Sequence, residues 1–194
     1  GRPAFSTGQL DLAREYADEN VTCIIETEGD EPILFLEPSC YSMLKEDYRE
    51  LGLRQMDEVE SRCFLIEDFI LEALESPNVN PNWNPEPPPM AIHSHCHTKS
   101  LSDRRTAHEL LSRIPGANVT ELDTGCCGMA GAFGAIAEKY ELSLKVAEPL
   151  ISKVTALSKD TILVASGTSC RHQIEHLSEK TPKHVIEVLA ELLQ

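Results

Sequence analysis

Positive charge is scarce in this sequence. Its 17 lysines and arginines are outnumbered by 32 aspartates and glutamates, which gives a net charge of −15 at pH 7, and no basic stripe occurs. Binding to a nucleic-acid backbone needs clustered lysine and arginine side chains. We therefore expect no nucleic-acid partner.

Long apolar runs are missing as well. No stretch approaches the ~18 apolar residues typical of a membrane span, and residues 1–20 lack the apolar core of a signal peptide. These absences predict a chain with no transmembrane segment. We expect a cytoplasmic location, with peripheral association at the inner membrane as an alternative.

The sequence also has no glycine-rich nucleotide-binding loop and no evident set of substrate-binding arginines. A chain without these features is not expected to oxidise a substrate alone. We assign no catalytic residue to it.

What is present is typical of a globular protein. The chain has 194 residues, of which 41% are hydrophobic and 25% charged, enough for one domain or two small ones. Apolar runs that predict strands alternate with amphipathic patterns that predict helices, which favours an α/β fold with mainly parallel sheets. Strands are expected within residues 31–38, 90–95, 117–123 and 160–166. Helices are expected at 8–20, 40–52, 57–76, 103–116, about 130–156 with a break before Pro149, and 182–194 with Pro182 near the first turn.

The chain also repeats itself. Residues 30–47 and 159–176 each run from an acidic start through an apolar strand to Ser-Cys and a helix, and residues 1–16 parallel residues 128–143. We interpret this as two pseudo-repeated βα halves, 1–80 and 81–194, joined by the proline-rich residues 77–89. The first half is expected to be truncated, cut from a longer protein after a first Cys-Cys pair; the alternative is chance similarity of two βα units.

Two adjacent cysteines, Cys126 and Cys127, lie between glycines. Neighbouring cysteines rarely form a disulfide with each other because the ring is strained, so metal ligation is the interpretation that uses both. Cys96 and Cys170 share a property with this pair: each follows a predicted strand. Because loops after parallel strands meet at the carboxyl edge of a sheet, we expect the four thiols to converge.

Glycines lie close to the Cys126–Cys127 pair. Gly125, Gly128 and Gly131 are expected to allow close backbone approach and positive φ.

Thiolate sulfur selects zinc, copper(I) or iron–sulfur clusters. The C-x₂₋₄-C spacing of zinc knuckles is absent, and adjacent ligands suit a polynuclear site, because each sulfur can address a different iron.

Three motifs carry a family resemblance: "HSHCH" at 93–97, "DTGCCGMAGAFG" at 123–134 and "ASGTSCRHQI" at 165–174. They resemble the cysteine-rich CCG domain that heterodisulfide reductase shares with the iron–sulfur subunit of glycolate oxidase. With "GRPAFSTGQLDLAR" and "LEPSC", the chain is most similar to the C-terminal region of fused FAD- and iron–sulfur-containing D-2-hydroxy acid dehydrogenases and oxidases.

The resemblance implies a cofactor, its ligands and a function. It implies a [4Fe-4S] cluster bound by Cys96, Cys126, Cys127 and Cys170, and a part of the protein outside this sequence that holds FAD. The implied function is electron transfer from the flavin, reduced by lactate, glycolate or 2-hydroxyglutarate. The implied partners are the flavin domain of the same polypeptide and an electron acceptor, which is another iron–sulfur centre, a quinone or a cytochrome.

One departure from the family pattern keeps alternatives open. The family often ends its motif in C-x-x-C, whereas Cys170 is followed by Arg171, His172 and Gln173. The missing cysteine argues against one alternative, a heterodisulfide-type thiol–disulfide reductase. The other alternative is a non-catalytic interaction domain in which zinc replaces the cluster.

The remaining cysteines and histidines receive simpler interpretations. Cys40 matches Cys170 in the first repeat, and Cys23 and Cys63 are expected to be small core residues. His93, His95 and His97 would share one face if the strand continued. We expect them to form hydrogen bonds around the cysteine loop, with direct metal ligation as the alternative; His97 would tune the cluster, and His172 could replace the missing cysteine. Arg171 is either a surface residue or a counter-charge to the cluster.

Overall fold

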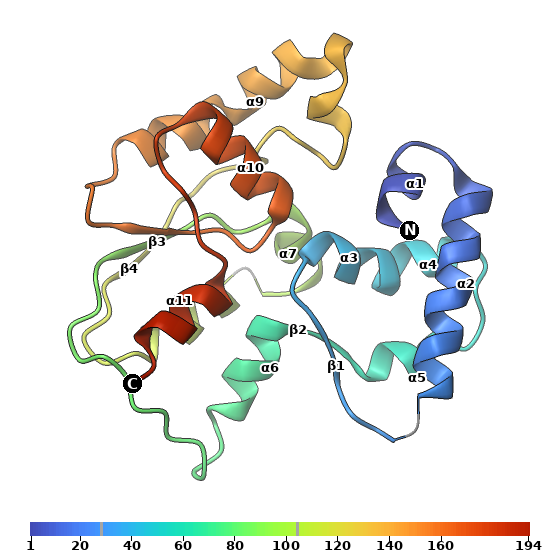
Figure 1. The fold of residues 1–194 in the computed structure, drawn as a ribbon, viewed down its shortest axis with the longest axis horizontal. Coiled ribbons are helices and arrows are strands. Elements are labelled where there is room, and N and C mark those ends of the chain that lie inside the picture. The colour runs from blue at the N-terminus through green and yellow to red at the C-terminus, as the bar shows by residue number, and fades with distance from the viewer. Residues whose placement is uncertain (28, 104) are drawn as a thin grey trace. The chain divides into compact units, whose positions relative to one another are not determined.

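The structure, a computed structural model, describes residues 1–27, 29–103 and 105–194. The chain divides into two compact units, Gly1–Ile66 and Glu67–Gln194 (Figure 1). Each unit contains a parallel sheet with helices packed on it, so the predicted α/β fold with mainly parallel sheets is confirmed. The repeat boundary after residue 80 stays a prediction.

The first unit is mainly helical around a two-stranded sheet. Strands β1 (Ile33–Phe35) and β2 (Cys63–Leu65) pair in parallel, with Ile33 opposite Cys63. The helical elements are α1 (Arg2–Ser6), α2 (Leu10–Glu26), α3 (Pro38–Ser42), the π-helical turn η1 (Met43–Asp47), α4 (Tyr48–Glu50) and α5 (Met56–Ser61).

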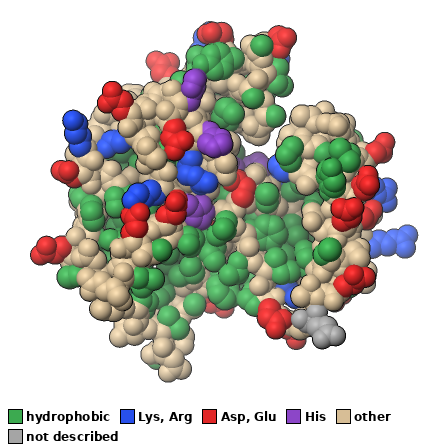
Figure 2. Space-filling model, in the orientation of Figure 1, with side chains coloured by type: hydrophobic (Ala, Val, Ile, Leu, Met, Phe, Trp, Pro, Cys, Tyr) green, Lys and Arg blue, Asp and Glu red, His purple; other side chains and the backbone are tan. Residues whose placement is uncertain are grey.

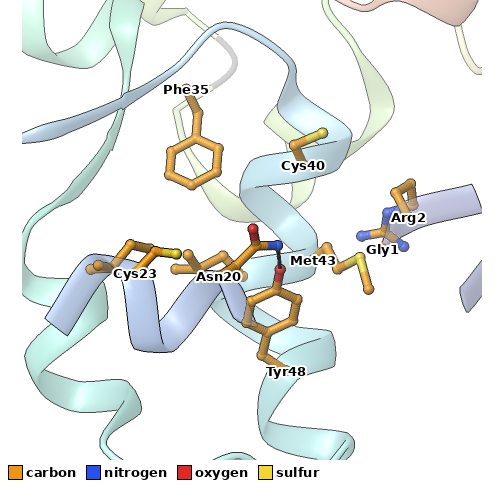
Figure 3. A pocket seen from close by; sticks show the side chains of 10 residues that line it. Gly1, Arg2, Asn20, Cys23, Phe35, Cys40, Met43 and Tyr48 are labelled. Atoms are coloured by element: carbon orange, nitrogen blue, oxygen red, sulfur yellow. Dashed lines mark hydrogen bonds between the residues drawn. The ribbon is translucent and has the colours of Figure 1, made fainter. Parts of the chain in front are cut away.

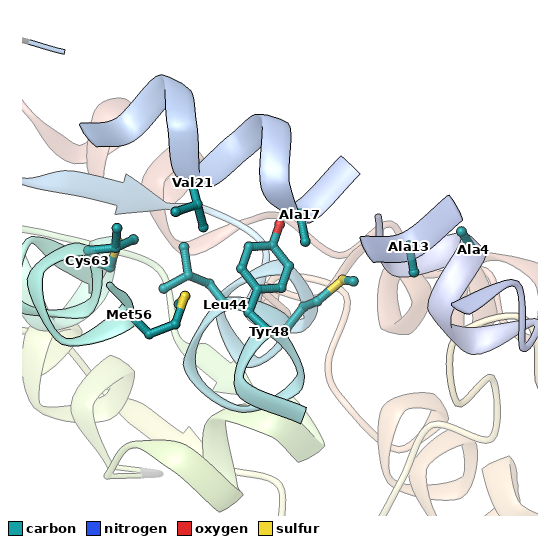
Figure 4. Packing of buried hydrophobic residues seen from close by; sticks show 10 residues of the cluster. Ala4, Ala13, Ala17, Val21, Leu44, Tyr48, Met56 and Cys63 are labelled. Atoms are coloured by element: carbon teal, nitrogen blue, oxygen red, sulfur yellow. The ribbon is translucent and has the colours of Figure 1, made fainter. Parts of the chain in front are cut away.

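One face of α2 forms the core of this unit. Ala13, Ala17 and Val21 recur every four residues along the helix, so they share one stripe, and all three are buried. They belong to the same buried cluster as Leu44 and Tyr48, which follow β1 in the chain (Figure 4). The two alanines leave room for the larger side chains opposite.

The second unit has three layers. Its sheet has the order β4-β3-β5, with all strands parallel. The strands are β3 (Met90–Ile92), β4 (Val119–Glu121) and β5 (Ile162–Val164). The helices are α6 (Ile66–Ala73), α7 (Cys96–Leu101), α8 (Thr106–Ser112), the 3₁₀ turn η2 (Phe133–Ala135), α9 (Ala137–Thr155), α10 (Thr168–Leu177) and α11 (Val185–Leu192).

Alternation along the strands separates the two faces of this sheet. Met90 and Ile92 join the buried cluster that includes residues of α8 and α11. Ala91, between them, joins a second cluster that includes residues of α9 and α10. Because successive strand residues point to opposite faces, helices cover the sheet on both sides. The strand ends are thereby held at one edge.

The predicted helix at 57–76 is wrong. Within it the chain forms α5, then β2, then α6. The apolar run Cys63–Leu65 fits a helix face and a buried strand equally well, since periodicity alone does not distinguish the two. Parallel pairing with β1 decides in favour of the strand.

Two expectations about prolines are also wrong. Helix α9 runs through Pro149 without a break. Proline removes one hydrogen bond inside a helix, but the buried stripe Ser143, Ala147, Leu150 and Val154 holds the helix together. Pro182 lies before His184, the N-cap of α11, and so outside the first turn.

Charge on the surface is dispersed. Figure 2 shows the aspartate and glutamate side chains scattered over the visible face rather than gathered in one patch. Among the helices that the structure describes, none has both the length and the hydrophobicity needed to cross a membrane.

Candidate metal centre

The four predicted cysteines follow the three strands of the second sheet. Cys96 is the first residue of α7, after β3. Cys126 and Cys127 lie in the loop after β4, and Cys170 is in the first turn of α10, after β5. Because the strands are parallel, these positions share the carboxyl edge.

The four thiols are in contact with one another. Thiol–thiol hydrogen bonds join Cys126 to Cys96 and to Cys127, and a further one joins Cys127 to Cys170. Cys127 and Cys170 are buried, whereas Cys96 and Cys126 are partly exposed. The structure thus brings together residues from three separate loops; whether they bind metal stays a prediction.

These contacts divide the thiols into donors and acceptors. Hydrogen bonds from Cys127 and Cys96 lower the pKa of Cys126 strongly, and the backbone N–H of Gly128, 3.3 Å from Cys126 Sγ, adds to this. A hydrogen bond from Cys127 lowers the pKa of Cys170 to about 5 against the opposing effect of burial. Cys96 and Cys127 are the donors of these hydrogen bonds, and donating them raises the pKa of both thiols. These hydrogen bonds therefore favour the thiolate form of Cys126 and Cys170, the form that binds metals.

The glycines around the pair differ in what they do. Gly128 has φ +93°, and a Cβ there would lie 2.2 Å from the carbonyl oxygen of Ser143 on α9. Gly131 also has positive φ, of 69°. Gly125 does not have positive φ, and a Cβ there would meet no other residue within 4 Å. The expectation of a positive φ is therefore confirmed at Gly128 and Gly131 and is wrong at Gly125.

Cationic side chains hold the loops that carry the cysteines. Lys99 Nζ donates to the carbonyl oxygen of Thr124 at 2.6 Å. Arg171 donates to the carbonyl oxygens of Ala165 at 2.9 Å and Ser166 at 2.6 Å. Sequence analysis did not single out Lys99, because a lone lysine in a short helix carries no motif. Arg171 is tied to its own loop and is not a free surface residue.

The three histidines of "HSHCH" do not share a face, because β3 ends at Ile92, before the first of them. His93 and His95 are buried, and His97 is partly exposed. His95 caps α7: its Nδ1 accepts a hydrogen bond from the backbone N–H of His97 at 3.1 Å. Its ring also packs on Gly167, where a Cβ would lie 2.1 Å from His95 Cδ2.

A buried carboxyl lies beside the loop that leads to Cys170. Ser166 Oγ donates to Oε1 of Glu67, while Oε2 of Glu67 is buried with no hydrogen-bond partner in the described residues. Burial raises the pKa of Glu67, opposed in part by the hydrogen bond from Ser166.

In the part of the chain that the structure describes, the cysteines do not form a site for a single metal ion. Among the described residues, no three His, Cys, Asp or Glu side chains gather around one metal position. A structural zinc ion needs about four ligands around one point. An iron–sulfur cluster is less demanding, because its protein ligands attach to different irons.

The first unit contains a different cysteine environment. One cavity in this unit, of about 260 Å³, is lined by residues that include Cys23, Cys40, Phe35 and Tyr48 (Figure 3). Partial burial and the nearby carboxylate of Glu37 raise the pKa of Cys40. Cys63 is buried as expected, but Cys23 is exposed, so its assignment to the core is wrong.

Comparison with known proteins finds a family model that matches part of the second unit. Residues 90–175, from β3 into α10, match the family model described as "Cysteine-rich domain" (CCG). This segment is therefore similar to the CCG cysteine-rich domain. It contains all four clustered cysteines, and the resemblance expected from the sequence is confirmed.

The relatives of the whole chain are dehydrogenases or their subunits. The chain is 30% identical over its full length to one subunit of the anaerobic glycerol-3-phosphate dehydrogenase of Escherichia coli K12, and it spans 49% of that subunit. It is 28% identical over its full length to D-2-hydroxyglutarate dehydrogenase of Pseudomonas putida, of which it spans 18%. A third relative, the D-2-hydroxyglutarate dehydrogenase of E. coli K12, is 24% identical over 84% of the chain. No solved structure matches the chain significantly.

The chain therefore spans about half, or less, of the relatives that it matches. The D-2-hydroxyglutarate dehydrogenases are of the class that the sequence resemblance indicated. The relationship to a glycerol-3-phosphate dehydrogenase is one that the sequence analysis did not name.

Proposed function

We propose that this chain is the iron–sulfur electron-transfer module of a flavin-dependent dehydrogenase. The observation that carries this proposal is the contact between four thiols from three loops at one sheet edge. The dehydrogenase relatives and the CCG domain support it.

The residues present fit a cluster of the [4Fe-4S] type. Cys96, Cys126, Cys127 and Cys170 would hold it, and two of them are already favoured as thiolates. The backbone N–H of Gly128 donates to sulfur, which stabilises negative charge at the site. When bound, the cluster supplies reversible one-electron transfer.

The relatives suggest the substrate of the whole enzyme. Glycerol-3-phosphate and D-2-hydroxyglutarate, which appear in the relatives' names, both contain a secondary alcohol beside an anionic group. We propose that the flavin, in another part of the enzyme, oxidises such an alcohol, in particular a D-2-hydroxy acid. This chain then passes the electrons to a further iron–sulfur centre, a quinone or a cytochrome, with the enzyme in the cytoplasm or at the periphery of the inner membrane.

Iron and sulfide analysis tests the proposal. After anaerobic reconstitution, the protein should be brown and should contain about four irons and four acid-labile sulfides per chain. A colourless protein that takes up about one zinc and no sulfide would support the zinc-binding module instead. That result would contradict the electron-transfer proposal.

The lowered pKa of the partly exposed Cys126 favours a second candidate, thiol–disulfide exchange. Reduced protein would then cleave a small disulfide in an assay without flavin. Iron-loaded protein that shows no such reaction leaves electron transfer as the function.

A further inference from the structure

His93 is held in place at the carboxyl edge of the second sheet. It follows the last residue of strand β3 and has only 1% of its surface exposed. Its backbone N–H donates to the carbonyl oxygen of Val164, on β5, at 2.9 Å. The sheet therefore fixes the backbone from which the imidazole projects.

The two nitrogens of this ring face two different residues. Nδ1 lies 2.9 Å from the hydroxyl oxygen of Thr124, in the loop after β4. Nε2 is fully buried and has no oxygen or nitrogen partner within the described part of the chain. Because Nδ1 is directed at Thr124, the hydrogen bond that joins His93 to the sulfur of Cys170 uses Nε2.

These contacts assign the tautomer of the neutral ring. A thiolate sulfur only accepts hydrogen bonds, so Nε2 carries the proton and donates it to Cys170. Nδ1 then carries the lone pair, and the hydroxyl of Thr124 donates to it. The other acceptor near this hydroxyl, the carbonyl oxygen of Leu122, is farther away, at 3.3 Å. A chain of hydrogen bonds from Thr124 through His93 to Cys170 thus joins the ends of all three strands.

Metal binding would leave His93 as a donor to this sulfur. In the metal-free protein, Cys170 also accepts from the thiol of Cys127. Thiols lose their protons when they bind a metal, so this second hydrogen bond disappears once both cysteines are ligands. The N–H of His93 is not consumed, and neither is the backbone N–H of Gly128 at Cys126. Of these two lasting donors, His93 is the one that a substitution can remove.

We propose that His93 is a positioning residue that sets the reduction potential of the centre, because its Nε2–H donates to the sulfur of Cys170 while Thr124 holds the ring. Reduction adds negative charge, and a hydrogen bond to a ligand sulfur stabilises that charge, more strongly in a buried site. His93 therefore raises the potential. The inference rests on the proposed function, since it needs the cluster.

Redox titration of the full chain, reconstituted with iron and sulfide under anaerobic conditions, tests this role. His93→Phe keeps a ring and removes the N–H, so the potential should fall. At a fixed ambient potential, the ratio of reduced to oxidised centre should be about tenfold lower than in wild type. His93→Gln keeps an N–H donor and should restore most of this loss. His176→Phe makes the same change at an exposed position of α10 and should leave the potential unchanged.

Pulsed electron paramagnetic resonance gives a second readout that a merely structural role would not produce. Wild-type protein labelled with ¹⁵N-histidine and reduced to a paramagnetic state should show a weak nitrogen coupling, transmitted through the N–H···S hydrogen bond. His93→Gln should lose the coupling of the labelled ring. A strong coupling, as from a nitrogen bound to iron, or no coupling at all, would overturn the inference.

The outcomes separate this inference from the proposed function. An iron-loaded His93→Phe variant with the wild-type potential would refute the role of His93 and leave the electron-transfer module intact. A potential in His93→Gln as low as in His93→Phe would assign the loss to packing and would also refute it. Protein that takes up no iron and sulfide would refute both. The wild-type spectrum is decisive if the His93→Phe variant does not fold.

Discussion

Cys40 and Cys170 occupy the same place in two similar βα units but differ in their chemistry. Each is the third residue of the helix that follows a parallel strand, α3 after β1 and α10 after β5. Cys40 is exposed, and its partial desolvation and the nearby Glu37 raise its pKa, whereas a hydrogen bond from Cys127 lowers the pKa of the buried Cys170. A helix N-terminus is thus not sufficient to make a reactive thiolate; the other thiols decide.

The largest expected difference comes from substituting Cys170 and Cys40 separately. Cys170→Ser should reduce bound iron more than about tenfold, because the variant loses a proposed ligand. Cys40→Ser should leave the iron content unchanged. Iron and sulfide analysis after anaerobic reconstitution measures both. Equal losses of iron in the two variants would show that Cys40 and Cys170 do not differ in this way.

Gly128 offers the next largest effect. Gly128→Ala combines positive φ with a Cβ 2.2 Å from the carbonyl oxygen of Ser143, so it should destabilise the protein by about 3 kcal/mol. Gly125→Ala is the matched control, since its Cβ meets no other residue within 4 Å. Urea unfolding of the metal-free chain gives both values. A stable Gly128→Ala variant would mean that the loop can move away from α9.

The structure also explains which parts of this arrangement sequence reasoning could reach. Apolar strands followed by cysteines predicted the parallel sheet and the shared edge, because the alternation of strand and helix patterns is visible locally in the sequence and favours parallel strands. The strand β2 was missed because Cys63–Leu65 becomes a strand only through pairing with β1. The histidines were expected to form hydrogen bonds around the cysteine loop, and His93 does so with Thr124. Lys99 was not singled out, because it contacts Thr124 across segments that are far apart in the sequence.

Glu67 should make stability depend on pH. Its folded pKa is raised above the unfolded value, so between these two values the folded state holds more protons and stability falls as pH rises. Glu67→Gln keeps an acceptor for Ser166 and removes the unfavourable ionisation of a buried carboxyl group. The variant should therefore gain stability relative to wild type at about pH 8 but not at about pH 4. An identical pH profile for the two proteins in urea unfolding would contradict the raised pKa.

Glu37, the carboxylate beside Cys40, should have a smaller effect. Its side chain caps α3 by accepting from the backbone N–H of Ser39 at 3.2 Å and from the Ser39 hydroxyl at 2.9 Å. Glu37→Ala should cost about 1 kcal/mol of unfolding free energy. Glu37→Gln retains an acceptor oxygen and should cost less. If both variants unfold like wild type, the cap contributes nothing measurable.

The burial of Cys127 and Cys170, set against the partial exposure of Cys96 and Cys126, gives the centre an inner and an outer side. In the proposed electron-transfer module, an electron that leaves for another protein would have its shortest route through the outer pair. Dioxygen reaches the same pair first. On the proposed function, efficient exchange with a redox partner and vulnerability to air would therefore have one structural origin, and a partner docked over the outer sulfurs would also shield them.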